Sequence, residues 1–171
     1  MNSTPPFSRA YPVSSLHDNA SQIAITATPG ECAALAREDG LVAIAGLEAD
    51  FRAKREGRTG VIITGEVRAC VTQTCVLSFE PFETQIKALV EARFDSVSPA
   101  DGVAFGVEDR DPPDLIVDGK IDLGALAAEF LALELDPYPR KPDAVFEGLQ
   151  LERQSPFAGL KDKIANKSPK K

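Results

Sequence analysis

An alternating pattern runs through Val61-Ile62-Ile63-Thr64-Gly65-Glu66-Val67-Arg68-Ala69-Cys70-Val71. Ile63, Val67 and Ala69 fall on one side of an extended chain, and Glu66 and Arg68 fall on the other. Successive side chains of a β-strand point to opposite faces of a sheet, so this spacing is typical of a strand with one buried face. The segment therefore predicts a strand that lends one face to a core.

The flanking segments continue the pattern and predict an antiparallel sheet. Upstream, a rough period of two links Val42, Ile44, Leu47, Ala49 and Phe51. The intervening Glu56–Gly60 is rich in turn formers, so the two stretches predict a long hairpin. Downstream of Glu80-Pro81, alternation resumes around Ile86, Ala88, Val90 and Ala92. Together these segments predict a meander that forms either an antiparallel sheet or a partial barrel. The alternation in Gln22–Thr26 predicts a further short strand.

Two helices are expected outside the meander, which makes the fold class α+β. The first is short and lies towards the N-terminus, where Thr28 is a suitable N-cap and Glu31 completes a capping box. The second, near 122–136, is longer and amphipathic. It must end at Asp136, because Pro137 cannot continue a helix.

Length and charge indicate one acidic domain. The 171 residues accommodate a single domain, which we place at 1–160. The formal charge of −7 is uneven: the tail 161–171 carries +4 and is expected to be disordered, whereas 100–136 carries −8. The acidic stretch 95–119 is expected to be a mobile loop. An acidic body argues against a large RNA footprint and fits a basic protein partner, although solubility also explains it.

The sequence gives no sign of a membrane or a secretory route. No apolar run approaches the ~20 residues that span a bilayer, and the N-terminus has no apolar signal core. Three cysteines without framework spacing suit free thiols in a reducing cytoplasm. The lead-in, residues 1–20, is expected to be extended or poorly ordered.

No catalytic or cofactor-binding pattern is present. The sequence has no phosphate-binding glycine loop and no nucleophile elbow, and its one histidine, His17, lies in the lead-in without a recognisable partner. Asp109, Asp111 and Asp114 lack the spacing of a calcium loop. We therefore expect no enzyme activity, no cofactor and no small-molecule substrate.

Cys70 and Cys75 are the one pair of cysteines close enough in sequence to suggest a metal site. Zinc needs further soft ligands, for which only Cys32 and His17 remain. On one straight strand the two thiols would face opposite sides, whereas a turn at residues 72–74 would bring them together. We expect structural thiols and no metal.

Basic residues around the expected hairpin tip offer one RNA-binding hypothesis. They are Arg52, Lys54, Arg55, Arg58 and Arg68. Single-stranded RNA readers add aromatic side chains for stacking, but the nearby Phe51 falls on the opposite face from Arg52. A solvated hairpin tip is the alternative interpretation.

Two separated blocks carry a family resemblance. The first is Gln73-Thr74-Cys75-Val76-Leu77-Ser78-Phe79-Glu80-Pro81-Phe82, and the second joins Ile121-Asp122-Leu123-Gly124 to Leu131-Ala132-Leu133-Glu134-Leu135-Asp136-Pro137-Tyr138-Pro139-Arg140. They resemble the YceD family, the large ribosomal RNA subunit accumulation proteins, in its alphaproteobacterial form. Phe7-Ser8-Arg9 and Ser155-Pro156-Phe157-Ala158-Gly159-Leu160-Lys161 resemble the family's start and end.

The resemblance implies a role in the synthesis, processing or accumulation of 23S ribosomal RNA. Together with the acidic charge of the chain, this role leads us to expect that the acidic loop contacts a basic ribosomal or RNA-processing protein, with 23S ribosomal RNA or its precursor as a further candidate partner. The resemblance brings no catalytic residues. It also implies that the lead-in packs on the body. Many relatives outside this group carry a Cys-x-x-Cys pair where this chain has Thr72 and Cys75, so the resemblance does not extend to a metal site.

On this basis we expect partner contacts at two places. One surface is shaped by Gln73, Cys75, Glu80 and Pro81. The other lies just past the second helix, at Asp136, Tyr138 and Arg140, because Tyr is a common interface anchor and Arg binds carboxylate or phosphate in a fork. A helix exit made rigid by proline is the alternative interpretation of the second segment.

Overall fold

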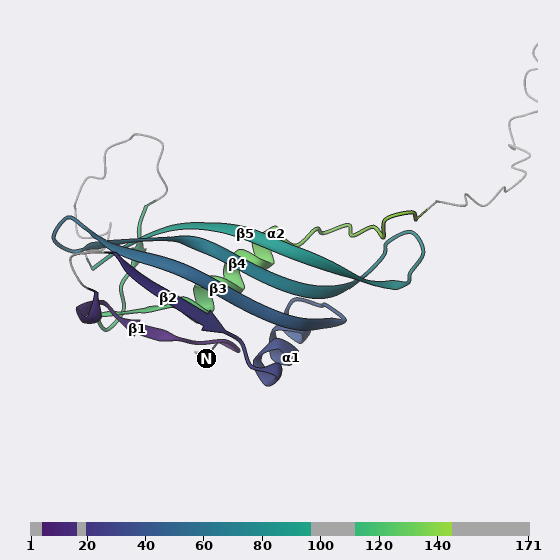
Figure 1. Ribbon diagram of the computed structural model, residues 1–171, viewed down its shortest axis with the longest axis horizontal. Coiled ribbons are helices and arrows are strands. Elements are labelled where there is room, and N and C mark those ends of the chain that lie inside the picture. The colour runs from purple at the N-terminus through teal and green to yellow at the C-terminus, as the bar shows by residue number, and fades with distance from the viewer. Residues whose placement is uncertain (1–4, 17–19, 97–111, 145–171) are drawn as a thin grey trace, which may run out of the picture.

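The computed structural model describes residues 5–16, 20–96 and 112–144, and its main element is a five-stranded sheet (Figure 1). Four strands form an antiparallel meander, and a short fifth strand joins it in parallel. In sheet order they are β2 (Ser21–Thr26), β3 (Ala43–Glu56), β4 (Gly60–Thr74), β5 (Pro81–Asp95) and β6 (Asp114–Leu115). Strands β2 and β6 are the edges of this sheet, so the antiparallel meander is present, and the partial barrel that was one alternative is not confirmed.

The expected hairpin is present as β3 and β4, which pair along most of their length. Phe51, Ile63 and Val67 are buried on the inner face, as their alternation predicts. A bulge between Ile44 and Gly46 shifts the register near the start of β3. Val42, the first residue of the alternating series, precedes β3 and is 57% exposed, whereas Ile44 of the same series is buried.

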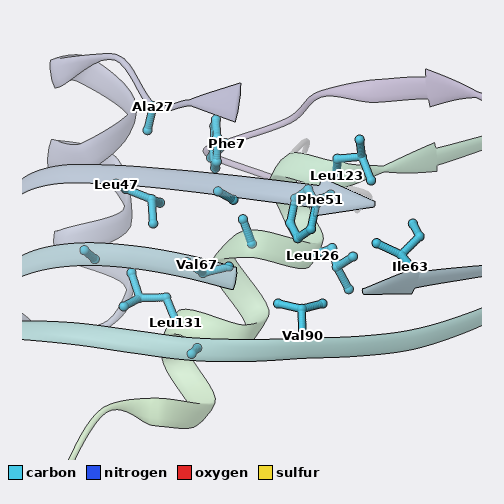
Figure 2. Close-up of a cluster of buried hydrophobic side chains, with 14 of the residues drawn as sticks. Phe7, Ala27, Leu47, Phe51, Ile63, Val67, Val90, Leu123, Leu126 and Leu131 are labelled. Atoms are coloured by element: carbon cyan, nitrogen blue, oxygen red, sulfur yellow. The ribbon is translucent and has the colours of Figure 1, made fainter. Parts of the chain in front are cut away.

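The inner face is covered by two helices. Helix α2 (Leu123–Glu134) packs against β4 and β5, and α1 (Pro29–Glu38) packs against β3. Figure 2 shows Leu126 and Leu131 of α2 among side chains of the sheet, so one face of the helix closes the core. The Asp122 side chain accepts from the backbone N–H of Gly124 and Ala125, which satisfies two groups at the start of α2.

Helix α1 begins with both hydrogen bonds of a capping box. The Thr28 hydroxyl accepts from the N–H of Glu31, and the Glu31 carboxylate accepts from the N–H of Thr28 at 2.7 Å. Glu31 also forms an ion pair with Arg9 at 2.7 Å. The helix start is therefore tied to the lead-in as well as to its own cap.

The described lead-in packs on the body, so the expectation of a poorly ordered segment is wrong for residues 5–16. Strand β1 (Ala10–Pro12) pairs with β7 (Lys120–Asp122), and a one-turn 3-10 helix, η1 (Val13–Ser15), follows β1. Phe7, which precedes β1, is only 1% exposed and belongs to the core. At Gly124 the backbones are so close that a Cβ would lie 2.8 Å from the carbonyl oxygen of Phe7. Glycine is needed there for the approach of α2 to the lead-in.

The stretch 95–119, predicted to be a mobile loop, contains regular structure in its described part. Asp114–Leu115 pairs with β5, and Val117 forms an isolated bridge with Lys120. Residues 97–111 lie outside the described residues, as do His17 and the basic tail 161–171.

Candidate functional site

The turn between β4 and β5 is joined to the segment that follows α2, at one end of the molecule (Figure 1). We call residues 75–80 the turn and residues 135–141 the strap. The N–H of Val76 donates to the carbonyl of Pro139 at 2.9 Å, and Lys141 forms an ion pair with Glu80 at 2.9 Å. The two expected contact surfaces are therefore one, which we name the turn–strap surface.

Hydrogen bonds inside the turn fix its shape. The N–H of Cys75 donates to the carbonyl of Glu80, and the N–H of Phe79 donates to the carbonyl of Cys75, both at 2.9 Å. Phe79 adopts a φ of 58°, which is uncommon for a residue with a bulky side chain. Its side chain is 80% exposed. The turn thus presents an aromatic ring to solvent at a cost in backbone strain.

The strap adds a second exposed aromatic side chain. Pro137 and Pro139 prevent α2 from continuing. The carboxylate of Asp136 accepts from the N–H of Tyr138 at 2.8 Å, which fixes the backbone at this residue. Tyr138 is 70% exposed. The strap is therefore an anchored segment whose aromatic side chain points outward.

The seven residues expected to contact a partner divide into an inner and an outer set. Gln73 and Cys75 are buried, and the Gln73 side-chain amide donates to the carbonyl of Asp136 at 3.4 Å. They act by holding the turn and the strap in place. The exposed members are Glu80, Pro81, Asp136, Tyr138 and Arg140.

Cys75 lies beneath the turn in a cradle of hydrogen-bond donors. The hydroxyl of Ser78, together with the backbone N–H groups of Ser78, Lys141 and Leu77, lowers the pKa of the Cys75 thiol to about 6. The residue is 0% exposed, which separates this thiolate from solvent reagents. The donors come from both the turn and the strap, so their hydrogen bonds to the Cys75 sulfur join the two segments.

Cys70 and Cys75 do not form a metal site with other described residues. Strand β4 stays extended through Thr74, so the turn at residues 72–74 that would bring the thiols together is not formed. Cys70 lies across from Gly46 and Gln85 in the sheet. All three cysteines are free, and residues 5–16, 20–96 and 112–144 contain no metal-binding group of three His, Cys, Asp or Glu.

Two of the five basic residues proposed to bind RNA, Arg55 and Arg68, are already engaged in contacts within the chain. Arg68 forms ion pairs on the outer face of the sheet with Asp50, with Glu66 at 3.1 Å and with Glu48 at 3.9 Å. Arg55 donates to the carbonyl of Val13 at 3.0 Å. The remaining three, Arg52, Lys54 and Arg58, are exposed. A phosphate group at Arg68 would have to compete with three carboxylates.

Three features of this end of the molecule were missed by sequence reasoning. Phe79 carries no turn signal, since positive φ is typical of Gly, Asn or Asp. Lys141 follows the second family-like block and had no assigned role. Asp39 had no assigned role, yet it lines a hollow of about 420 Å³ between α1 and the strap. A contact between segments distant in sequence creates this hollow.

A family model described as large ribosomal RNA subunit accumulation protein YceD matches residues 63–163. The chain belongs to the YceD family. No curated protein and no solved structure matches it. The YceD match begins inside β4 and extends beyond the strap, so it includes the whole turn–strap surface, whereas α1 and Asp39 precede it. The family name connects the chain with accumulation of the large ribosomal RNA subunit.

Among the described residues, no helix is long and apolar enough to cross a membrane.

Proposed function

We propose that this chain is a non-catalytic cytoplasmic factor that supports the synthesis, processing or accumulation of 23S ribosomal RNA through contacts with a basic ribosomal or RNA-processing protein. The YceD match supports the ribosomal role. The exposure of Phe79 and Tyr138 on a braced surface supports the protein contact. These two anchors are surrounded by polar or conformationally restricted residues, which are Glu80, Pro81, Asp136 and Arg140.

The two aromatic side chains are pre-organised for binding. Exposed aromatic side chains on a rigid backbone lose little conformational freedom on binding, and each buries a large apolar area against a partner. Phe79 is held by the backbone of the turn, and Tyr138 by the proline-bounded strap. The hydrogen bond from Val76 to Pro139 connects the two segments. Such residues are typical energetic centres of protein interfaces.

Direct RNA binding through Arg52, Lys54, Arg55, Arg58 and Arg68 is the alternative. Its main weakness is Arg68, whose guanidinium lies among carboxylates on the outer face. Direct binding would give a steep loss of RNA affinity with salt, and Arg52→Ala with Lys54→Ala and Arg55→Ala would reduce that dependence. A salt-dependent affinity that these changes abolish would favour the alternative over the protein-contact proposal.

The experiment is depletion of the protein in its host, followed by complementation with variants. Phe79→Asn removes the ring with a residue that tolerates positive φ, and Tyr138→Ser removes the second ring. The double variant should leave a low ratio of 23S to 16S ribosomal RNA, whereas wild type restores the ratio. The matched control is Leu89→Thr, because Leu89 is 75% exposed on the opposite, outer face of the sheet. Full restoration by the double variant would refute the proposed surface.

A further inference from the structure

The hollow between the end of α1 and the strap combines apolar walls with hydrogen-bond acceptors. Its walls come from the end of α1, the end of β4 and the α2–strap segment. The apolar lining residues are Leu41, Ala132, Leu135, Pro137 and Pro139. The polar lining includes the side chains of Asp39, Gln73 and Asp136.

The carboxylate of Asp39 is the unusual group in this hollow. Its Oδ2 atom is buried and accepts no hydrogen bond from the described residues. Asp39 is also the C-cap of α1, where the helix dipole is negative and opposes a carboxylate. Burial is the main cause that raises the pKa of Asp39, and the negative charge of the neighbouring Glu38 raises it further. A buried acceptor without a donor is rare in folded proteins and costs stability.

Gln73 adds a second acceptor that is held in place. The residue is only 6% exposed, and its amide nitrogen donates to the carbonyl of Asp136 at 3.4 Å. The amide oxygen accepts no hydrogen bond within the described part of the chain and is left for a donor from outside. With Asp39 and Asp136 nearby, the polar part of the hollow carries a negative potential.

An aliphatic wall that leads to carboxylate and amide oxygens matches one kind of side chain. Arginine and lysine carry methylene stems that pack on apolar surfaces, and both end in a cation with several donors and no acceptor. The negative end of α1 favours the same charge. The neighbouring turn–strap surface supplies the aromatic anchors next to which such a residue would sit.

We infer that the hollow lined by Asp39, Gln73 and the strap binds an arginine or lysine side chain of a basic protein partner. The inference rests on the proposed function and names the residue type that the turn–strap surface recognises. The cation lies against the carboxylates of Asp39 and Asp136, and its stem covers Leu41 and Leu135.

The test uses the full chain labelled with ¹⁵N and three small probes, which are the Nα-acetyl amides of arginine, lysine and citrulline. Citrulline has the shape of arginine without its charge. The cationic probes should shift the amide signals of Gly40, Leu41 and Thr74, and citrulline should bind at least about tenfold more weakly, equivalent to ~1.4 kcal/mol. Equal binding of citrulline would overturn the inference, and this comparison needs no variant.

Asp39→Asn should abolish the response to arginine and lysine. The matched control is Glu38→Gln, which removes the same charge from the adjacent, exposed residue and should leave the response intact. A response that Asp39→Asn leaves unchanged, or one confined to the outer face of the sheet, would also overturn the inference.

Failure of this inference differs from failure of the proposed function. If the turn–strap variants lower the ratio of 23S to 16S ribosomal RNA but no cationic probe binds, the hollow has no such role while the surface retains its own. If the cationic probes bind selectively but the double variant restores the ratio, the site exists and the ribosomal role of this surface is refuted.

Discussion

Lys141 and Glu80 lie 61 positions apart in the chain, and their side chains meet in an ion pair of 2.9 Å. This pair joins the strap to the turn, beside the hydrogen bond from Val76 to Pro139. The Lys141 and Glu80 side chains are 46% and 60% exposed, so solvent weakens their attraction. The backbone bond and the thiolate cradle at Cys75 therefore provide the more rigid part of the connection.

Removal of the ion pair should loosen the strap without unfolding the domain. Lys141→Met is expected to change the free energy of unfolding only slightly, because solvent weakens ion pairs between exposed side chains. Hydrogen exchange of the Val76 amide should become faster, because its acceptor is on the strap. Lys54→Met, a change at an exposed lysine on the outer face, serves as the control. Unchanged exchange at Val76 would show that the ion pair does not position the strap.

The Cys75 thiolate should make stability rise with pH above neutrality. The pKa of Cys75 is about 6 in the folded protein, whereas a cysteine in an unfolded chain has a pKa of about 8.5. Between these values the unfolded chain binds more protons, so the contribution is complete above about pH 8.5 and is lost as pH falls through the folded pKa.

Urea unfolding of the reduced protein measures this effect at pH 6 and at pH 8.5. Cys75→Ser should flatten the rise in the free energy of unfolding, and Ser78→Ala should reduce it, because its hydroxyl is the strongest donor to the thiolate. Cys70→Ser is the control, since Cys70 lies on the strand away from the turn. An equal rise in wild type and Cys75→Ser would contradict the cradle.

Acid should weaken the contact between the lead-in and α1. The Arg9 side chain, then the backbone of Thr28, lowers the pKa of Glu31 from 4.5 to about 2. A depressed folded pKa gives stability that is present above the unfolded value and is lost as pH falls towards the folded value. The loss should therefore occur between about pH 4.5 and pH 2.

Glu31→Gln should reduce this acid sensitivity, measured as the free energy of unfolding across that interval. Some acid sensitivity should remain in the variant, because the pKa of Asp122 is also lowered. Burial alone would raise that pKa, but hydrogen bonds from Ser8, Arg9, Ala125 and Gly124 outweigh the effect of burial. Glu83→Gln, at an exposed position on β5, provides the comparison. The same acid profile for Glu31→Gln and wild type would rule out this ion pair as a source of acid sensitivity.

A methyl group at Gly124 should separate the lead-in from α2. An added Cβ would lie within 2.9 Å of backbone atoms of Phe7, Ser8 and Arg9, which cannot move as a flexible side chain can. Gly124→Ala is expected to lower the free energy of unfolding by about 1–3 kcal/mol. Gly30→Ala is the matched control, because nothing lies within 4 Å of the position that a Cβ would take there. That change should be neutral or should stabilise α1 by up to about 1 kcal/mol. Equal stabilities of the two variants in a urea titration would disprove the close approach.

Local pattern was sufficient for the long strands and for the start of α1, whereas β1 and β7 were not predicted and α2 ends at Glu134, two residues before the predicted end at Asp136. The alternation around Ile63 and Val67 identified the buried face of β4, because the period of two in side-chain direction is a property of the backbone itself. Thr28 was recognisable as a cap, since a cap needs only residues close in sequence. The bulge between Ile44 and Gly46 was not recognisable, because no residue type marks it.

The candidate site was only half visible in the sequence. Gln73, Cys75 and Tyr138 stood out through the family resemblance, but as parts of two surfaces. The two surfaces are one because Val76 forms a hydrogen bond with Pro139. Asp39 lies at the same place because the end of α1 lies beside the strap.

The α+β class, the meander, the helix caps and the family could all be read from the chain of residues, because alternation, capping and motif residues act over short separations. Three properties emerged only from the folded arrangement: Phe7 is core, the turn and the strap are joined, and an acceptor at Asp39 is left without a donor among the described residues. Those properties belong to contacts between distant segments, which no local pattern encodes.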